Sequence, residues 1–292
     1  MNQQKIKKIL PVVLWALMTV LGVCSCKAVD VLNLTIPRKG YSVFYDIAYG
    51  TQSRQNLDVY VPDKLDASHS TIVFFYGGSW QFGNKNMYRF IGQAFASKGF
   101  ISVIVNYRLY PEVYFPAFVE DGAKALKWVH KNIQNYGGDS NHVFLAGHSA
   151  GAHIAALLVT DKHYLQAQGG DSSWVKGMIG IAGPYDFLPF TDPKVKALFS
   201  KVSDEQTQPI NYIERGLPPF LLVTGAMDTG VFPKNTINFA NQLRHFKVPV
   251  MEIIYPKIGH IGIILSLAAG FRYKVPLLED ITHFIESVNN AK

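Results

Sequence analysis

Residues 142–158 read HVFLAGHSAGAHIAALL and combine an apolar run, a serine between two glycines and an alanine-rich segment. The run predicts a buried strand, the alanine-rich segment predicts a helix, and Gly147–Gly151 (G-x-S-x-G) predicts the tight turn between them. A serine hydroxyl is a weak nucleophile that must stand exposed beside a base, and the flanking glycines let such a turn close. Ser149 is therefore the candidate nucleophile. A glycine-rich connection in which Ser149 only caps the helix is the alternative.

Apolar, strand-forming runs alternate with helical patterns along the rest of the chain. The alternation predicts the α/β class, with a mostly parallel eight-stranded sheet flanked by helices on both faces. No helix separates the first two strands, so they are expected to form an antiparallel N-terminal edge. The expected strands are 41–48, 57–61, 71–76, 100–106, 142–146, 177–182, 220–224 and 250–255, and the expected helices are 84–98, 116–135, 150–159, 233–246 and 275–289.

The stretch Pro184–Pro219 is irregular and rich in proline, aspartate and lysine. A stretch of this length either carries a short helix or lies over a site as a flap. No linker divides the chain after its N-terminal leader, so residues 27–292 are expected to form a single domain.

The bulk properties narrow the classes of partner and cofactor. The net charge is +7, but the lysines and arginines are scattered among acidic residues, which argues against nucleic-acid binding. The sequence contains no Cys/His cluster, HExxH or EF-hand loop, and no nucleotide-binding glycine motif. Neither a metal nor any other cofactor is therefore expected.

The N-terminus resembles an export signal. Basic residues at 5–8 precede an apolar stretch over Ile9–Val23, which is short for a membrane span and suits a signal-peptide core. Cys26 follows the small Ser25, as in a bacterial lipoprotein box. Residues 1–26 are thus expected to be a signal peptide with Cys26 as the lipidation candidate; a simply cleaved leader and a retained anchor are the alternatives. The product is expected to be exported: periplasmic or membrane-anchored if bacterial, and otherwise secreted.

Three stretches together resemble the α/β-hydrolase superfamily. They are YGGSW (76–80), YRLYPEVYFPAFVEDGAKALKWV (107–129) and GGDSNHVFLAGHSAGAHIAAL (137–157). In this order and spacing they are similar to the carboxylesterase-like branch, which includes hormone-sensitive-lipase-type esterases and arylformamidases. The resemblance implies the α/β-hydrolase fold over nearly everything from about Tyr45 onward.

The resemblance also implies a base and an acid, in the chain order serine, acid, histidine. His260 follows an expected strand in a short loop, where a base can reach Ser149, whereas His245 and His283 fall in helical patterns. Asp228 follows the strand FLLVTG and matches the family's acid position. Asp186, after the preceding strand, is the competing acid and is interpreted as a turn-former.

The resemblance assigns the oxyanion hole to backbone amides of Gly78, Ser79 and Ala150. The family usually has His where this chain has Tyr76, so Tyr76 is expected to prop the loop. Trp80 is expected to pack behind it. Arg108, Glu112, Glu120 and Asp121 are interpreted as structural links between the sheet edge and the next helix.

These residues predict a serine esterase that cleaves small carboxylic esters through an acyl-enzyme on Ser149. Amide or formamide hydrolysis, as in arylformamidases, and sugar O-deacetylation are the enzymatic alternatives. A non-catalytic homologue that binds ligands is the alternative from another class. The sequence does not determine the oligomeric state.

Overall fold

The structure is a computed structural model that describes residues 32–33 and 35–291. The expected leader over residues 1–26 and the lipidation candidate Cys26 lie outside the described residues. The strands are β1 Tyr41–Ala48, β2 Asn56–Pro62, β3 Thr71–Phe75, β4 Ile101–Val105, β5 Val143–His148, β6 Gly177–Ile181, β7 Phe220–Gly225 and β8 Val250–Tyr255. The longer helices are α2 Arg89–Ala96, α3 Ala117–Asn132, α4 Ala150–Thr160, α6 Pro193–Phe199, α7 Lys234–His245, α8 His260–Leu265 and α9 Leu277–Asn290.

One eight-stranded sheet runs through the molecule in the order β1-β2-β4-β3-β5-β6-β7-β8. Strands β3 to β8 are all parallel, whereas β1 pairs antiparallel with β2, and β2 antiparallel with β4. The predicted fold class and its antiparallel N-terminal edge are confirmed. Because the parallel strands point the same way, the loops that follow β3, β5, β7 and β8 meet at one edge of the sheet.

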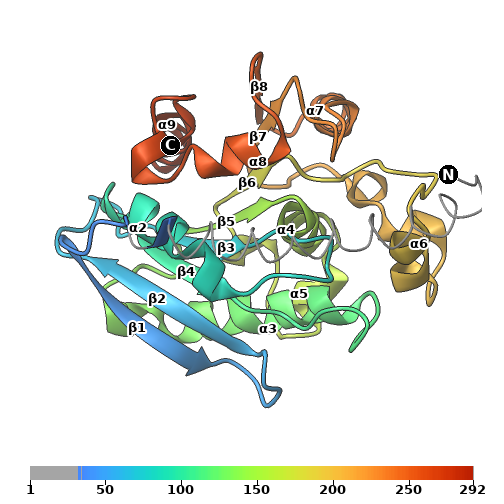
Figure 1. Cartoon of the computed structure of the whole chain (residues 1–292). Helices are drawn as coiled ribbons and strands as arrows, with labels where there is room; N and C mark the ends of the chain where they lie inside the picture. Colours follow the sequence, from blue (N-terminus) through green and yellow to red (C-terminus); the bar gives the residue numbers. More distant parts are fainter. Residues whose placement is uncertain (1–31, 34, 292) are drawn as a thin grey trace, which may run out of the picture.

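Helices cover both faces of the parallel part of the sheet. On one face, Phe74 of β3 packs against Phe95 of α2, and Phe144 of β5 packs against Phe284 of α9. Side chains alternate between faces along a strand, so the neighbouring Phe75 points the other way, toward Gly122 of α3. Figure 1 shows α2 and α9 together on one side of the sheet and α3 on the opposite side. Fully burying a large apolar side chain of this kind stabilises the fold by about 1.5–3 kcal/mol.

A buried ion pair ties β4 to α3. Arg108, three residues after β4, binds both carboxylate oxygens of Asp121 at 2.8 and 2.7 Å, and Asp121 is fully buried. The structural role predicted for these two residues is confirmed. The same prediction is wrong for Glu112 and Glu120, whose side chains are exposed.

Two local predictions need correction. The helix expected over 84–98 begins as a 3₁₀ turn at Lys85–Tyr88, and α2 starts only at Arg89. His260 was expected inside a loop but is the first residue of α8. The stretch Pro184–Pro219 carries the short helix α6, one of its two anticipated forms. In the part of the chain that the structure describes, none of the helices is long and apolar enough to span a membrane.

Candidate active site

Ser149 stands on a sharp turn between β5 and α4. Its backbone has φ 54° and ψ −123°, a strained conformation for a residue other than glycine. A Cβ on Gly147 would overlap the carbonyl oxygen of Gly151, and a Cβ on Gly151 would overlap the carbonyl oxygen of Phe75. The two glycines of G-x-S-x-G are therefore required by close backbone packing around the serine. The hydroxyl is left at the carboxyl edge of the sheet, where the neighbouring loops converge.

The loops after β7 and β8 bring an aspartate and a histidine to this serine. His260 Nε2 lies 2.9 Å from Ser149 Oγ, and His260 Nδ1 lies 2.7 Å from Asp228 Oδ2. Asp228 is almost fully buried. Its other carboxylate oxygen, Oδ1, accepts hydrogen bonds from the backbone amides of Gly230 and Val231 at 2.9 and 2.8 Å. An ionised carboxylate only accepts, so Nδ1 carries the proton and Nε2 is left to accept the serine hydroxyl. The three side chains form one hydrogen-bonded row.

The residues considered as alternatives lie elsewhere. Asp186 Oδ2 accepts a hydrogen bond from Asn238 Nδ2, and its backbone amide donates to Asn235, so Asp186 holds a turn against α7. His245 ends α7, and His283 is an exposed residue of α9. Of the candidate acids and bases, the structure brings only Asp228 and His260 to the serine.

The loop after β3 carries the expected oxyanion donors. Gly78, Ser79 and Trp80 have φ values of 130°, 52° and 58°, three successive residues in the left-handed region. A Cβ on Gly77 would lie 3.0 Å from Ser149 Cβ, so this loop lies directly against the nucleophile. Within residues 35–291 none of the backbone amides of Gly78, Ser79 and Ala150 donates to a protein acceptor. Such amides are available to a developing negative charge.

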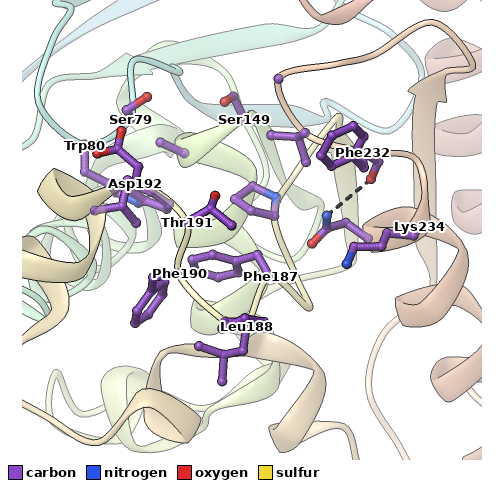
Figure 2. A pocket seen from close by; sticks show the side chains of 17 residues that line it. Ser79, Trp80, Ser149, Phe187, Leu188, Phe190, Thr191, Asp192, Phe232 and Lys234 are labelled. Carbon is purple, nitrogen blue, oxygen red and sulfur yellow. Dashed lines mark hydrogen bonds between the residues drawn. The ribbon is translucent and has the colours of Figure 1, made fainter.

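A cavity of about 320 Å³ opens beside Ser149. Its walls come from the oxyanion loop, the start of α4, the stretch 184–195 and the residues before α7; most are apolar, including Trp80, Phe187, Phe190 and Phe232. Figure 2 shows Ser79 and Ser149 at one end of the cavity and Leu188 at the other. The stretch Pro184–Pro219 thus lies over the site as well as carrying a helix. Trp80 packs behind the loop against Phe118 and Phe199, as expected, and also lines the cavity.

The other three aromatic wall residues, Phe187, Phe190 and Phe232, could not be predicted from the sequence, because they lie outside every motif. Among the residues that the structure describes, no group of three or more His, Cys, Asp or Glu could hold a metal ion.

Two further histidines are buried near the site. His148 lies beside the nucleophile, and its Nε2 lies 3.1 Å from the carbonyl oxygen of His260, to which it donates. His153 of α4 donates from Nε2 to the carbonyl oxygen of Thr207 at 2.8 Å, linking α4 to the chain that covers the site. Burial lowers the pKa of His148 to about 3 and the pKa of His153 to about 4. Both are therefore neutral in the folded protein near pH 7.

This burial predicts that stability falls in acid. Between pH 6.5 and about 4 the unfolded chain binds protons on both histidines that the folded chain excludes, so the free energy of unfolding rises with pH across this window. Each histidine contributes a slope of about 1.4 kcal/mol per pH unit. We expect His153→Gln to lower this slope by the contribution of one histidine, about 1.4 kcal/mol per pH unit. Denaturant unfolding at several pH values measures the slope. The exposed His283→Gln is the control, and an unchanged slope in His153→Gln would contradict the assignment.

Comparison with known proteins agrees with this architecture. The chain is 27% identical over 280 residues to the isoprenylcysteine alpha-carbonyl methylesterase ICME of Arabidopsis thaliana, covering 86% of this chain and 65% of the relative. It is 31% identical over 242 residues to the probable carboxylic ester hydrolase LipM of Mycobacterium tuberculosis, covering 74% of this chain and 55% of LipM. The chain thus spans between about half and two thirds of these relatives.

Solved structures share the fold at low identity. Esterase B from Lactobacillus rhamnosis, in complex with a tributyrin phosphonate, superposes with a TM-score of 0.78 at 18% identity and covers 94% of each chain. A truncated carbohydrate esterase from gut microbiota superposes with a TM-score of 0.75 at 21% identity, covering 87% of this chain and 99% of the other. Residues 57–243 match the family model described as BD-FAE. Since this match covers more than half of the 292 residues, the chain belongs to the BD-FAE family, within the carboxylesterase-like α/β-hydrolases.

Proposed function

We propose that this protein is a serine carboxylesterase that cleaves small carboxylic esters through an acyl-enzyme on Ser149. The observation that carries the proposal is the row Ser149–His260–Asp228, with contacts of 2.9 and 2.7 Å, at the end of a largely apolar cavity. The esterase relatives support the same chemistry. A ligand-binding homologue without catalysis has no need of this aligned row, so the geometry disfavours that alternative.

The proposed reaction proceeds in the following steps, which the geometry of this row supports. His260 Nε2 takes the proton from Ser149 Oγ as Oγ attacks the ester carbonyl carbon, while Asp228 stabilises the imidazolium. The carbonyl oxygen becomes an oxyanion and accepts hydrogen bonds from the backbone amides of Gly78, Ser79 and Ala150. The tetrahedral intermediate collapses, and His260 gives its proton to the leaving alcohol. A water molecule then attacks the acyl-enzyme by the same path and releases the acid.

The size of the cavity predicts the preferred acyl length. A volume of about 320 Å³ is at the lower end of ligand pockets, and its aromatic walls suit an apolar group. Each methylene that fits such a pocket is worth about 10-fold or more in kcat/KM. We expect p-nitrophenyl esters to peak at about four to eight acyl carbons and to fall for palmitate. A higher kcat/KM for N-formylkynurenine or for an acetylated sugar would instead favour the formamidase or deacetylase alternative.

We also propose that the mature protein is exported and attached to a membrane through lipid on Cys26. The support is the basic, apolar and cysteine-containing order of residues 5–26 alone. Metabolic labelling with palmitate in a bacterial host checks it: Cys26→Ser should lose the label and Cys24→Ser should keep it.

A further inference from the structure

The oxyanion loop over residues 76–83 is held in a strained shape. Its three successive left-handed residues, Gly78, Ser79 and Trp80, include two with a Cβ. A residue of that kind is strained in this conformation and persists only where the surrounding structure fixes it. Some other part of the molecule must therefore hold the loop in place.

The carbonyl groups of the loop show what holds it. Tyr107 donates its hydroxyl to the carbonyl oxygen of Tyr76 at 2.7 Å, and the backbone amide of Tyr110 donates to that of Trp80 at 2.9 Å. At the far end of the loop, Arg54 Nη2 donates to the carbonyl oxygen of Gly83 at 2.7 Å. The two peptides that carry the amides of positions 78 and 79 are also held: the carbonyl oxygen of Gly77 accepts the Tyr88 hydroxyl at 3.4 Å, and that of Gly78 accepts two backbone amides of the same loop at 3.0 Å. The contacts at Tyr76, Trp80 and Gly83 therefore fix the frame of the loop around these two peptides.

Arg54 joins these contacts into one unit. Besides Gly83, its Nη2 donates to the Tyr76 hydroxyl at 2.7 Å, and its Nε donates to the carbonyl oxygen of Tyr107 at 2.8 Å. Arg54 comes from the turn before β2, so it connects the antiparallel edge of the sheet to both ends of the loop.

Tyr76 is suited to receive that bond. Its side chain is fully buried, and its ring stacks between those of Tyr88 and Tyr107, with centroids 5.3 and 4.6 Å away. The hydroxyl accepts from Arg54 and donates to Asn106 Oδ1 at 3.2 Å. Burial raises the pKa of Tyr76 to about 12, so the hydroxyl keeps the proton that it donates.

We propose that the Arg54–Tyr76 hydrogen bond is the brace that fixes the oxyanion loop, and that both are positioning residues for the transition state. The proposal rests on the proposed esterase function. Neither side chain lines the cavity, so the brace acts on the oxyanion amides rather than on bound substrate. Loss of one oxyanion donor costs about 10²–10³ in kcat, and a donor that is only displaced costs less.

Tyr76→Phe removes the hydroxyl and keeps the stacked ring. We expect kcat for a short-chain p-nitrophenyl ester to fall about 10- to 100-fold while KM changes less than about threefold. Affinity for a trifluoromethyl ketone, whose tetrahedral adduct places an oxyanion on the same amides, should fall in step with kcat. The matched control is Tyr60→Phe, because Tyr60 is also buried and its hydroxyl has no partner among residues 35–291. This control should leave all three quantities unchanged.

The change in kcat distinguishes a brace of the oxyanion loop from a role in substrate binding. Wild-type kcat in Tyr76→Phe, or a rise in KM alone, would overturn the proposal. If Tyr76→Phe does not fold, Arg54→Lys tests the same bond: it keeps the charge but cannot reach all three acceptors with a planar fork, and it should lower kcat in the same way. Wild-type kcat in Arg54→Lys would likewise overturn it. Failure of the esterase function itself would appear separately, as no turnover in the unmodified protein.

Discussion

Ser149→Ala is expected to lower kcat by about 10⁶-fold, with residual turnover above the uncatalysed rate from the oxyanion hole and substrate binding alone. The reason is that Ser149 Oγ is the atom that bonds to the acyl carbon, and 2.9 Å from His260 Nε2 it has a base to take its proton. The alanine methyl group can do neither. Hydrolysis of a p-nitrophenyl ester, followed by absorbance at high enzyme concentration, measures the loss.

Stability provides the control for this prediction. Alanine keeps the Cβ of Ser149 and removes only the hydroxyl with its hydrogen bond to His260 Nε2, so the free energy of unfolding should change by no more than about 1 kcal/mol. Ser172→Ala, an exposed serine in a 3₁₀ turn, should leave both activity and stability at wild-type values. Turnover by Ser149→Ala within 10-fold of wild type would rule out the acyl-enzyme mechanism.

Asp228→Asn is expected to lower kcat by about 10⁴-fold while leaving the fold intact. Asp228 Oδ1 accepts two backbone amides, so the asparagine oxygen should take that place and its NH₂ group should face His260 Nδ1. An N–H donor there requires Nδ1 to be unprotonated, and the neutral ring then carries its proton on Nε2. In that tautomer Nε2 cannot accept the proton of Ser149.

The competing aspartate supplies the matched control. Asp186→Asn removes the same charge from the loop after β6, where the carboxylate accepts a hydrogen bond from Asn238. We expect its kcat to stay within about threefold of wild type. A large loss in Asp186→Asn together with a small loss in Asp228→Asn would show that the acid has been assigned to the wrong residue.

Much of this architecture can be read from the sequence because strands such as β3 and β5 are buried on both faces. TIVFF of β3 and VFLAG of β5 have to be continuously apolar or small there, which makes them recognisable as runs in the sequence. The G-x-S-x-G turn is visible for a related reason: Gly147 and Gly151 each lie where a Cβ would strike backbone. The position of Ser149 on a tight turn could therefore be predicted from the local glycine pattern, without reference to the rest of the fold.

What the sequence could not show depends on contacts between distant segments. Arg54 and Tyr76 are 22 residues apart, and no periodicity links them; only the packing of β2 beside β4 brings the arginine to the loop. Phe187 and Phe190 are aromatic residues in a proline-rich stretch whose path over the site is set by tertiary packing. The start of α8 at His260 was missed for a different reason, because the apolar run IGIIL after it was not interpreted as a helix.

Whether Ser149 is an activated nucleophile can be measured by intact-mass analysis after treatment with an alkyl fluorophosphonate, which reacts with an activated serine and mimics the tetrahedral intermediate. We expect one phosphonyl group per chain, mapped by peptide analysis to Ser149, with no adduct in Ser149→Ala and slow labelling in Asp228→Asn. An unlabelled wild-type protein, or an adduct on any other residue, would contradict it.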